Sequence, residues 1–375
     1  MHLRTILLRL HRWSGLTLGV VLAAIALSGA ATVAVFDVER WVGLREAPAD
    51  SGRAPFEADA VAIATAFPGA QCDNYFPADA PGRPDRIETV LRSGERKEDF
   101  TVFCDPASGR VIGDTRGSTL VAFLHAVGKA HGSLFLSEAE GRTILGFFAL
   151  ALLAFAASGL WLWWTMAAAA RSSGGTPFAW HRALGFLTLP VLLISAGTGL
   201  LFSWQWTRPL TYRALGGDAA TLPYFAMTDT QRAAFRGTGV GTPLGIDALV
   251  AAARAQPAVA GCDRVLRITS LASKAAKPVK IAFDYPGNDD YRAGGVVVQI
   301  DRISGAAVFV DDPRGRLSGW LLSRQWAFHA GRWGSSADGW GIAARWLWIV
   351  GGVGIAALAL SGAVLWRRRR RQLGG

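Results

Sequence analysis

Acidic residues are absent from three long stretches of this sequence. All 28 Asp and Glu lie within residues 37–140 and 207–341, and none lies in 1–36, 141–206 or 342–375. These acid-free stretches contain four apolar runs that also lack Lys and Arg, at residues 16–36, 143–166, 183–206 and 346–366. Because a transmembrane helix needs about 20 apolar residues, we predict four membrane-spanning helices in contact with membrane lipid.

Cysteine is scarce, and its three residues show neither a CxxC motif nor a zinc-ligand spacing. This excludes the common structural zinc modules and thioredoxin-like redox motifs. Cys72 and Cys104 fall in one expected outer domain and are a candidate disulfide in an oxidising compartment. The sequence leaves that pairing open, and Cys262 would then remain without a partner cysteine.

Excess basic charge reflects membrane topology. The net charge is +11, but ten arginines lie in short segments beside the apolar runs: Arg4, Arg9, Arg12, Arg171, Arg182 and the run from Arg367 to Arg371. By the positive-inside rule, both termini and the link between the second and third runs are cytoplasmic. The two long segments then lie outside a bacterial inner membrane, in the periplasm. The remaining charges nearly balance, so we expect no nucleic-acid partner.

The first apolar run also has features of a secretory signal peptide, since a basic start precedes it and small residues lie near its end. It is long for a signal peptide, and its removal would delete one member of an internal repeat. We therefore interpret it as a retained membrane helix.

The internal repeat covers both halves of the chain. Residues 9–29, RLHRWSGLTLGVVLAAIALSG, align without a gap with 179–199, AWHRALGFLTLPVLLISAGTG. Residues 141–163 likewise match 344–366, and both contain SG followed by LW. Each half therefore reads as an outward helix, a small outer domain and a returning helix. We predict an α-helical membrane protein, a four-helix transmembrane bundle with two periplasmic α+β lobes, built as a tandem repeat.

Both long outer segments show the same order of predicted elements. A helical stretch, 56–69 and then 245–259, precedes strand-like stretches at 86–92 and 97–103, and then at 279–285 and 295–301. The predicted segments are the N-terminus and first helix (1–37), lobe 1 (38–120), an outer histidine segment with the second helix (121–170), the cytoplasmic link with the third helix (171–206), lobe 2 (207–318), and an outer His/Trp segment with the fourth helix and basic tail (319–375).

Five of the six histidines lie near the ends of the predicted spans. His11 and His181 open the outward helices on the cytoplasmic side, and His125, His131 and His329 precede the returning helices on the outer side. A single histidine at a membrane edge is most simply an interfacial polar residue. Histidines at equivalent places in two repeats can instead face each other in a bundle core, where facing helices hold cofactors.

Haem suits these positions better than zinc. Zinc favours four ligands, often Cys or carboxylate, which the spans lack, whereas haem iron needs one or two axial ligands and imidazole suits it. We predict two b-type haems, with His11 and His181 as the axial iron ligands of the cytoplasmic one and His329 with His131 or His125 for the outer one. Nearby glycines leave room for the macrocycle, namely Gly15, Gly19, Gly128, Gly132, Gly185 and Gly331.

Arginines at the membrane edges are candidates to pair with haem propionates. Arg12 and Arg182, next to the cytoplasmic histidines, are the clearest, although interfacial arginines commonly act as anchors. The outer ligand stays open. FLHA around His125 resembles AFHA around His329, which favours His125, whereas the family pattern below favours His131.

Four motifs carry a family resemblance: LHRWSGL (10–16), AHGSLFLSEAEGR (130–142) leading to SGLWLW, WHRALG (180–185) and FHAGRWG (328–334) leading to SGAVLWRR. In these the chain resembles the PepSY-associated transmembrane-helix family over nearly its whole length. The resemblance implies PepSY-like lobes and an outer histidine a short distance before a Gly, as His131 is before Gly141. Several members act in iron acquisition. The resemblance therefore implies an inner-membrane ferric-siderophore reductase, an oxidoreductase that carries electrons outward and releases Fe(II).

The electron donor is expected to be a quinol, a partner protein or a cytoplasmic reductant. No dinucleotide-binding fingerprint follows a strand on the cytoplasmic side, and the cytoplasmic segments are too short for a flavin or nicotinamide domain. Rival interpretations are a membrane-anchored PepSY binding module without redox activity, a haem carrier serving another periplasmic acceptor, and a transporter. Transporters often have inverted repeats, whereas this repeat is parallel and its spans lack charge.

Overall fold

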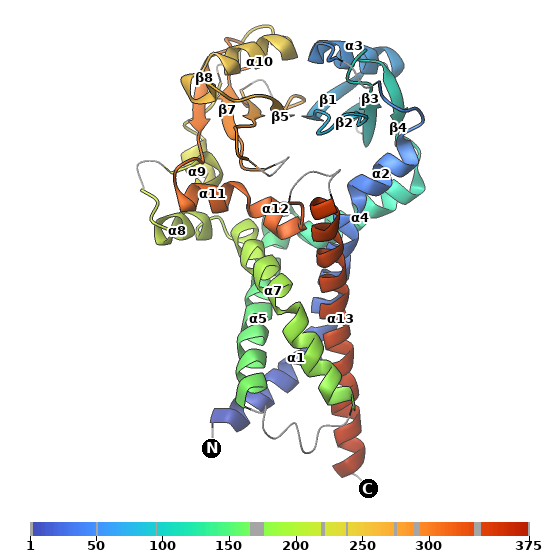
Figure 1. Ribbon diagram of the computed structural model, residues 1–375, viewed down its shortest axis with the longest axis vertical. Coiled ribbons are helices and arrows are strands. Elements are labelled where there is room, and N and C mark those ends of the chain that lie inside the picture. The colour runs from blue at the N-terminus through green and yellow to red at the C-terminus, as the bar shows by residue number, and fades with distance from the viewer. Residues whose placement is uncertain are drawn as a thin grey trace.

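The computed structural model describes residues 3–49, 52–94, 96–165, 176–218, 222–237, 239–273, 276–288, 293–333 and 339–373. Within these residues, four helices are long and apolar enough to cross a membrane. They are α1 (Leu3–Val33), α5 (Glu138–Thr165), α7 (Thr176–Ser203) and α13 (Gly339–Leu373). Figure 1 shows them running together as the lower part of the molecule. The predicted four-helix membrane protein is confirmed, while part of the predicted cytoplasmic link, with Arg171, lies outside the described residues.

Each long helix extends beyond the apolar run that predicts it. α1 begins at Leu3 and α7 at Thr176, so His11 and His181 lie within regular helix rather than at its first residue. α13 continues through the arginine run to Leu373. Pro190 lies inside α7 without ending it, as occurs in membrane helices whose neighbours compensate for the lost hydrogen bond.

The bundle is a ring of four neighbours. α1 packs on α13 and α5, and α7 packs on the same two helices, so α1 and α7 occupy one diagonal. Small residues allow the helices to approach closely, as at membrane helix interfaces generally. Gly19 faces Ala359 where α1 crosses α13, and Gly351 faces Val191 where α13 crosses α7.

The two outer segments share one antiparallel sheet of eight strands within the described residues, in the order β4-β3-β2-β1-β5-β6-β7-β8. β1 and β5 join the two sets, with Tyr75 opposite Ile268. The sequence predicted two lobes but not this continuity. The strands are β1 (Ala70–Phe76), β2 (Asp85–Ser93), β3 (Arg96–Cys104), β4 (Val111–Asp114), β5 (Val265–Thr269), β6 (Val279–Phe283), β7 (Val296–Ile300) and β8 (Ala307–Asp311).

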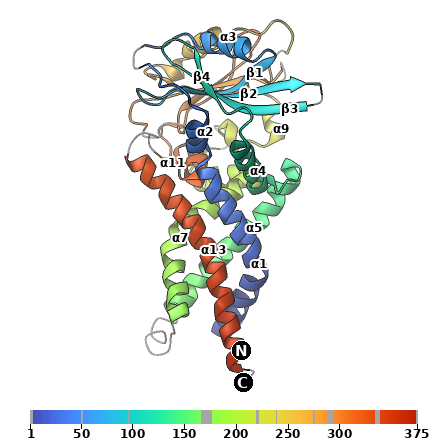
Figure 2. The same ribbon diagram turned by 90° about the vertical axis from the view of Figure 1, so that its right-hand side faces the viewer.

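Two helices cover the sheet face that is remote from the bundle, α3 (Phe56–Ala66) and α10 (Ile246–Arg254) (Figures 1 and 2). Apolar side chains from these helices and from the sheet form the main core of the outer region. The helices also cap each other. Asp247 accepts hydrogen bonds from the backbone N–H groups of Phe56 (3.0 Å) and Glu57 (2.9 Å), and Glu57 accepts one from Ile246 (2.7 Å). Because free N–H groups at a helix start need partners, this exchange ties the two lobes together.

Short helices connect the sheet to the bundle. α2 (Val35–Gly43) and α4 (Thr119–Ser133) lie below the first half of the sheet, and α4 packs on α1 and α5. Below the second half lie α8 (Thr207–Ala214), α9 (Asp229–Arg232), α11 (Leu317–Ser323) and α12 (Gln325–Ala330), of which α12 packs on α7 (Figure 1). Two short 3-10 turns, η2 (Tyr224–Ala226) and η3 (Pro257–Val259), complete the described helices. α4 and α12 thus place the outer histidines against the top of the bundle.

The three cysteines are free thiols in this structure. Cys72 lies on β1 and Cys104 on β3, and β2 runs between these two strands. Adjacent strands are about 4.8 Å apart, whereas the two Cα atoms of a disulfide lie within about 7 Å. The intervening strand therefore excludes the candidate disulfide.

A buried group of charged residues holds α3 to the sheet. The hydroxyl of Tyr75 contacts the carboxylates of Asp59 and Asp85, and Arg53 bonds Asp85 (2.8 Å) and the Tyr75 hydroxyl (3.0 Å). Burial and the neighbouring Asp85 carboxylate raise the pKa of Asp59 from its ordinary 3.8 to about 8. At neutral pH Asp59 is therefore protonated in the folded protein and ionised in the unfolded chain.

This difference predicts a pH-dependent stability. Since the folded state holds a proton that the unfolded state has lost, stability should fall as the pH rises from about 5 to about 8. Asp59→Asn, which is neutral at every pH, should flatten that dependence. The measurement is the unfolding temperature of the detergent-purified protein across this range, with Asp99→Asn, an exposed carboxylate on β3, as the control. An unchanged slope in Asp59→Asn would contradict the assignment.

Candidate functional site

Two histidines lie near the end of the bundle that carries both chain termini. His11 on α1 forms a hydrogen bond through Nδ1 to the Ser158 hydroxyl of α5 (2.9 Å), and His181 on α7 does the same with the Ser361 hydroxyl of α13 (2.8 Å). The two rings are close enough to interact electrostatically. Because α1 and α7 occupy one diagonal, each imidazole is held by a helix beside its own. We call this pair the inner layer.

A second pair lies at the opposite end of the bundle, below the sheet. Nδ1 of His131 on α4 lies 3.0 Å from the carbonyl oxygen of Ile25 and 3.3 Å from the Ser28 hydroxyl, both on α1. His329 on α12 faces His131, with ring centroids 5.9 Å apart. We call this pair the outer layer.

His329 is held by α7 as His131 is held by α1. Its Nδ1 lies 3.1 Å from the carbonyl oxygen of Ser195 and 3.0 Å from the Thr198 hydroxyl. The indole N–H of Trp348 on α13 also donates a hydrogen bond to the His329 carbonyl (3.0 Å). These contacts fix both the ring and the backbone of α12 against the bundle.

All four histidines contact the same two-residue unit on the supporting helix. The residue after each hydroxyl is a glycine, and a Cβ built on that glycine would lie 2.8 to 3.8 Å from Cε1 of the supported imidazole. We call these units the Ser/Thr-Gly pairs: Ser28-Gly29, Ser158-Gly159, Thr198-Gly199 and Ser361-Gly362. The glycine lets the ring lie directly against the helix, and the hydroxyl holds Nδ1.

The structure brings His131, and not His125, to His329. Nε2 of His125 lies 2.8 Å from Glu39, whose side chain is fully buried on α2. Glu39 also accepts two hydrogen bonds from Arg86, at 2.7 and 2.9 Å. His125 therefore belongs to a polar network that joins α2, α4 and β2 beneath the sheet.

The two layers are separated by most of the bundle length. On α1, His11 and the outer support Ser28 are 17 positions apart, as are His181 and Thr198 on α7. At 1.5 Å per residue the axial separation is about 26 Å, close to a hydrocarbon core of about 30 Å. Apolar side chains fill the space between the layers, including Leu22, Ala156, Leu192 and Ile355.

The arginines differ between the two layers. The Nε atoms of Arg12 and Arg182, beside the inner histidines, are buried and have no hydrogen-bond partner among the described residues. At the outer end, Arg142 pairs with Glu138 and Arg345 with Asp37 (3.4 Å), and Arg332 donates to the backbone carbonyl of Val33. A buried N–H group without a hydrogen-bond partner is costly, and an anionic group beside these two Nε atoms would satisfy them.

These residues fit haem. Metal–imidazole bonds are about 2 Å long, so two rings on opposite sides of one iron have centres roughly 6 Å apart, and the outer pair shows 5.9 Å. Within the described parts of the chain, no hydrogen bond reaches Nε2 of His11, His131, His181 or His329. The unpartnered nitrogens of Arg12 and Arg182 suit propionate groups.

The sequence did not indicate which residues hold the four histidines. The SG and TG pairs were visible in the repeat alignment, but only as markers of the repeat. The glycines singled out beside the histidines make other contacts, such as Gly15 with Phe155 and Gly185 with Leu358. The recurrence of the Ser/Thr-Gly pairs in both repeats was the signal in the sequence. Its meaning depends on which helices lie side by side, and the sequence alone does not state this.

Arg208 is a second residue that the sequence did not indicate. It lies in the first turn of α8, and its guanidinium lies 5.9 Å from the ring of Phe202, which in turn contacts His329 (5.3 Å). Burial, followed by the neighbouring cations Arg232 and Arg142, lowers the pKa of Arg208 to about 10. A buried cation therefore lies beside the aromatic ring that contacts His329.

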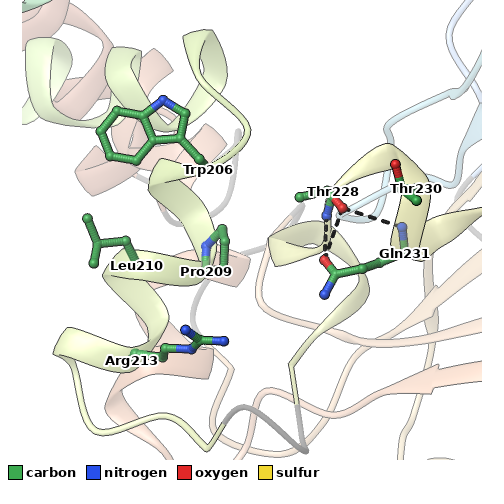
Figure 3. Close-up of a pocket in the computed structure, with 7 residues that line it drawn as sticks. All are labelled: Trp206, Pro209, Leu210, Arg213, Thr228, Thr230 and Gln231. Atoms are coloured by element: carbon green, nitrogen blue, oxygen red, sulfur yellow. Dashed lines mark hydrogen bonds between the residues drawn. The ribbon is translucent and has the colours of Figure 1, made fainter.

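A pocket of about 540 Å³ lies outside both layers, between α8 and α9 (Figure 3). Trp206, Pro209 and Leu210 form its apolar side, and no histidine lines it. It is open to the surface and has no described contact with the imidazole pairs.

The fold and the site define a four-span membrane protein with an imidazole pair at each end of its bundle. The chain belongs to the PepSY-associated TM region family, whose model matches residues 8–369. The predicted family is thereby confirmed. No curated protein matches the chain.

The close contact at Gly29 predicts a specific sensitivity. A methyl group there would lie 2.8 Å from Cε1 and 3.2 Å from Nδ1 of His131, so Gly29→Ala should push the ring off Ile25 and Ser28. Losing these hydrogen bonds should cost about 1 kcal/mol. Gly128→Ala, at the same α1–α4 interface but with an ordinary 3.7 Å contact, should be tolerated. Unfolding temperatures in detergent test this, and equal stability of both variants would contradict it.

Proposed function

We propose that this protein is a haem-dependent transmembrane oxidoreductase that carries electrons from the cytoplasmic side to the periplasm. There it reduces Fe(III) in a ferric siderophore to Fe(II), so that the iron is released. The observation that carries the proposal is an imidazole pair at each end of the bundle, with Nε2 atoms that make no hydrogen bond among the described residues.

The charge distribution supports an orientation in a bacterial inner membrane. The basic start of α1 and the arginine run at the end of α13 lie at the same end of the bundle (Figure 2). By the positive-inside rule, that end faces the cytoplasm and the sheet lies in the periplasm. The repeated order of helix and four strands in α3–β4 and α10–β8 supports two PepSY-like lobes that arose as a tandem repeat.

The chain's own residues hold and orient the cofactors. His11 and His181 would hold one haem in the inner layer, and His131 and His329 one in the outer layer. Arg12 and Arg182 would pair with the propionates of the inner group. Haem held there would supply reversible one-electron Fe(III)/Fe(II) chemistry, and b-type attachment needs no cysteine near the site.

The substrate class rests on the resemblance to ferric-siderophore reductases. Adding one electron to chelated Fe(III) lowers the ion's charge and weakens its attraction to the anionic oxygens of the chelator. The electrostatic field of Arg208, a cation beside the outer layer, favours approach of an anionic chelate. An electron moving outward is also favoured by the membrane potential, at about 2.3 kcal/mol per 100 mV. The donor is a quinol or a cytoplasmic reductant.

Removing both ligands of one layer should remove one haem and leave the other. We expect about two haems per chain in the wild type and about one in the double variants His11→Leu/His181→Leu and His131→Leu/His329→Leu, because each pair is the whole axial set of its iron. Pyridine haemochrome analysis of detergent-purified protein gives the count. Reoxidation of the dithionite-reduced protein by a ferric siderophore under anaerobic conditions then tests the substrate class.

His125→Leu is the matched control for the outer pair. It removes an imidazole from the same helix, α4, but one that bonds Glu39 rather than facing His329. It should retain both haems. Loss of a haem in His125→Leu, with both haems retained in the single variant His131→Leu, would transfer the ligand role to His125 and contradict the pairing.

The unpartnered Nε atoms of Arg12 and Arg182 lead to a prediction about the midpoint potential of the inner haem. Replacing Arg12 and Arg182 by Gln removes two cations that stabilise the more negatively charged, reduced site, so the midpoint potential of the inner haem should fall by tens of millivolts. Arg9→Gln, an exposed arginine of the same helix, should leave it near the wild-type value. Spectroelectrochemical titration measures both. Equal potentials in all three proteins would remove these arginines from the haem site.

A further inference from the structure

We propose that the Ser/Thr-Gly pairs are positioning elements that lock all four histidines in the Nδ1–H tautomer, so that Nε2 presents its lone pair to iron. The inference rests on the proposed function for the role of Nε2. The tautomer itself follows from hydrogen bonds within the chain. Ser28, Ser158, Thr198 and Ser361 thereby act through the histidines rather than on the iron.

The outer layer shows the tautomer most directly. Nδ1 of His131 bonds the carbonyl oxygen of Ile25 (3.0 Å), and Nδ1 of His329 bonds that of Ser195 (3.1 Å). A carbonyl oxygen only accepts hydrogen bonds. Nδ1 must therefore carry the hydrogen, and in a neutral imidazole Nε2 then holds the lone pair.

In the inner layer, the serine hydroxyls fix the same Nδ1–H tautomer. Ser158 donates its own hydrogen to the carbonyl oxygen of Phe155 (3.2 Å), and Ser361 donates to that of Leu358 (2.9 Å). A hydroxyl has one hydrogen to donate, so each serine oxygen is left as an acceptor toward its histidine. Nδ1 of His11 and of His181 is therefore the donor in the contacts at 2.9 and 2.8 Å.

A Ser/Thr-Gly pair supports each of the four histidines that we propose as iron ligands. Ser28 and Thr198 also donate to the carbonyl three residues earlier, at 2.9 and 3.3 Å. All four hydroxyls are thus committed as donors along their own helix, and all four are acceptors toward a histidine of another helix. Hydrogen bonds of this kind orient metal-bound imidazoles, and their removal typically costs 10–100-fold in metal affinity.

Ser158 is the most informative residue to change. Among the described contacts it is the only hydrogen-bond partner of His11, whereas both outer histidines also bond a carbonyl. Ser158→Ala should allow His11 to adopt both neutral tautomers. Ser158→Thr should keep His11 in the Nδ1–H tautomer because the hydroxyl remains. Ser14→Ala removes a serine hydroxyl of α1 that bonds only its own helix at Leu10, and serves as the matched control.

The first readout needs no haem. Nitrogen chemical shifts of ¹⁵N-histidine-labelled, haem-free protein should show His11 as Nδ1–H in the wild type, Ser158→Thr and Ser14→Ala, and as a tautomer mixture in Ser158→Ala. In the haem-loaded protein, Ser158→Ala should lose haem from the inner layer about 10-fold more readily and shift its low-spin spectrum, while Ser158→Thr restores both.

The outcomes separate this inference from the proposed function. An Nε2–H tautomer of His11 in the wild type, or an unchanged pure Nδ1–H tautomer in Ser158→Ala, would overturn the positioning role even if two haems are bound. The expected tautomers in a wild-type protein that binds no haem would uphold the positioning role and overturn the function for which we propose it.

Discussion

The structure depends on one hydrogen bond made four times, from an imidazole Nδ1 on one helix to a Ser/Thr-Gly pair on another. It connects α1 to α5, α7 to α13, α4 to α1 and α12 to α7. In a hydrocarbon environment no water competes for these groups, so each bond both anchors a helix and orients a ring. The bundle and the candidate haem sites are thus built by the same contacts.

The outer region positions the second imidazole pair rather than merely covering it. α4 and α12 are short and lie between the bundle and the sheet. Phe36 links these parts, since its ring lies 4.0 Å from the guanidinium of Arg86 on β2 and 4.1 Å from that of Arg332 beside α12. Arg86 in turn bonds the buried Glu39 of α2. These contacts join the first lobe to the segment that carries His329.

Much of this architecture follows from the sequence because its signals are local. Apolar runs without charge predict membrane helices, and apolar strand-like stretches such as those of β2 and β7 predict strands. The joining of the two lobes through β1 and β5 rests on a single described pair, Tyr75 and Ile268, far apart in the chain, and no periodicity reports it. The choice between His125 and His131 stayed open in the sequence for the same reason. Motif similarity around His125 reflects the repeat, whereas the facing of His131 and His329 depends on how α4 and α12 pack.

The central claim is that electrons cross the membrane through this protein when its imidazole pairs hold haem. The most direct test is to reconstitute the haem-loaded protein in sealed vesicles with reductant trapped inside, and to add a ferric siderophore and an Fe(II)-specific chromogenic chelator outside. The account predicts external Fe(II) in these vesicles and none in vesicles with haem-free protein. Equal Fe(II) in both, or none in either while the protein binds two haems, would contradict it.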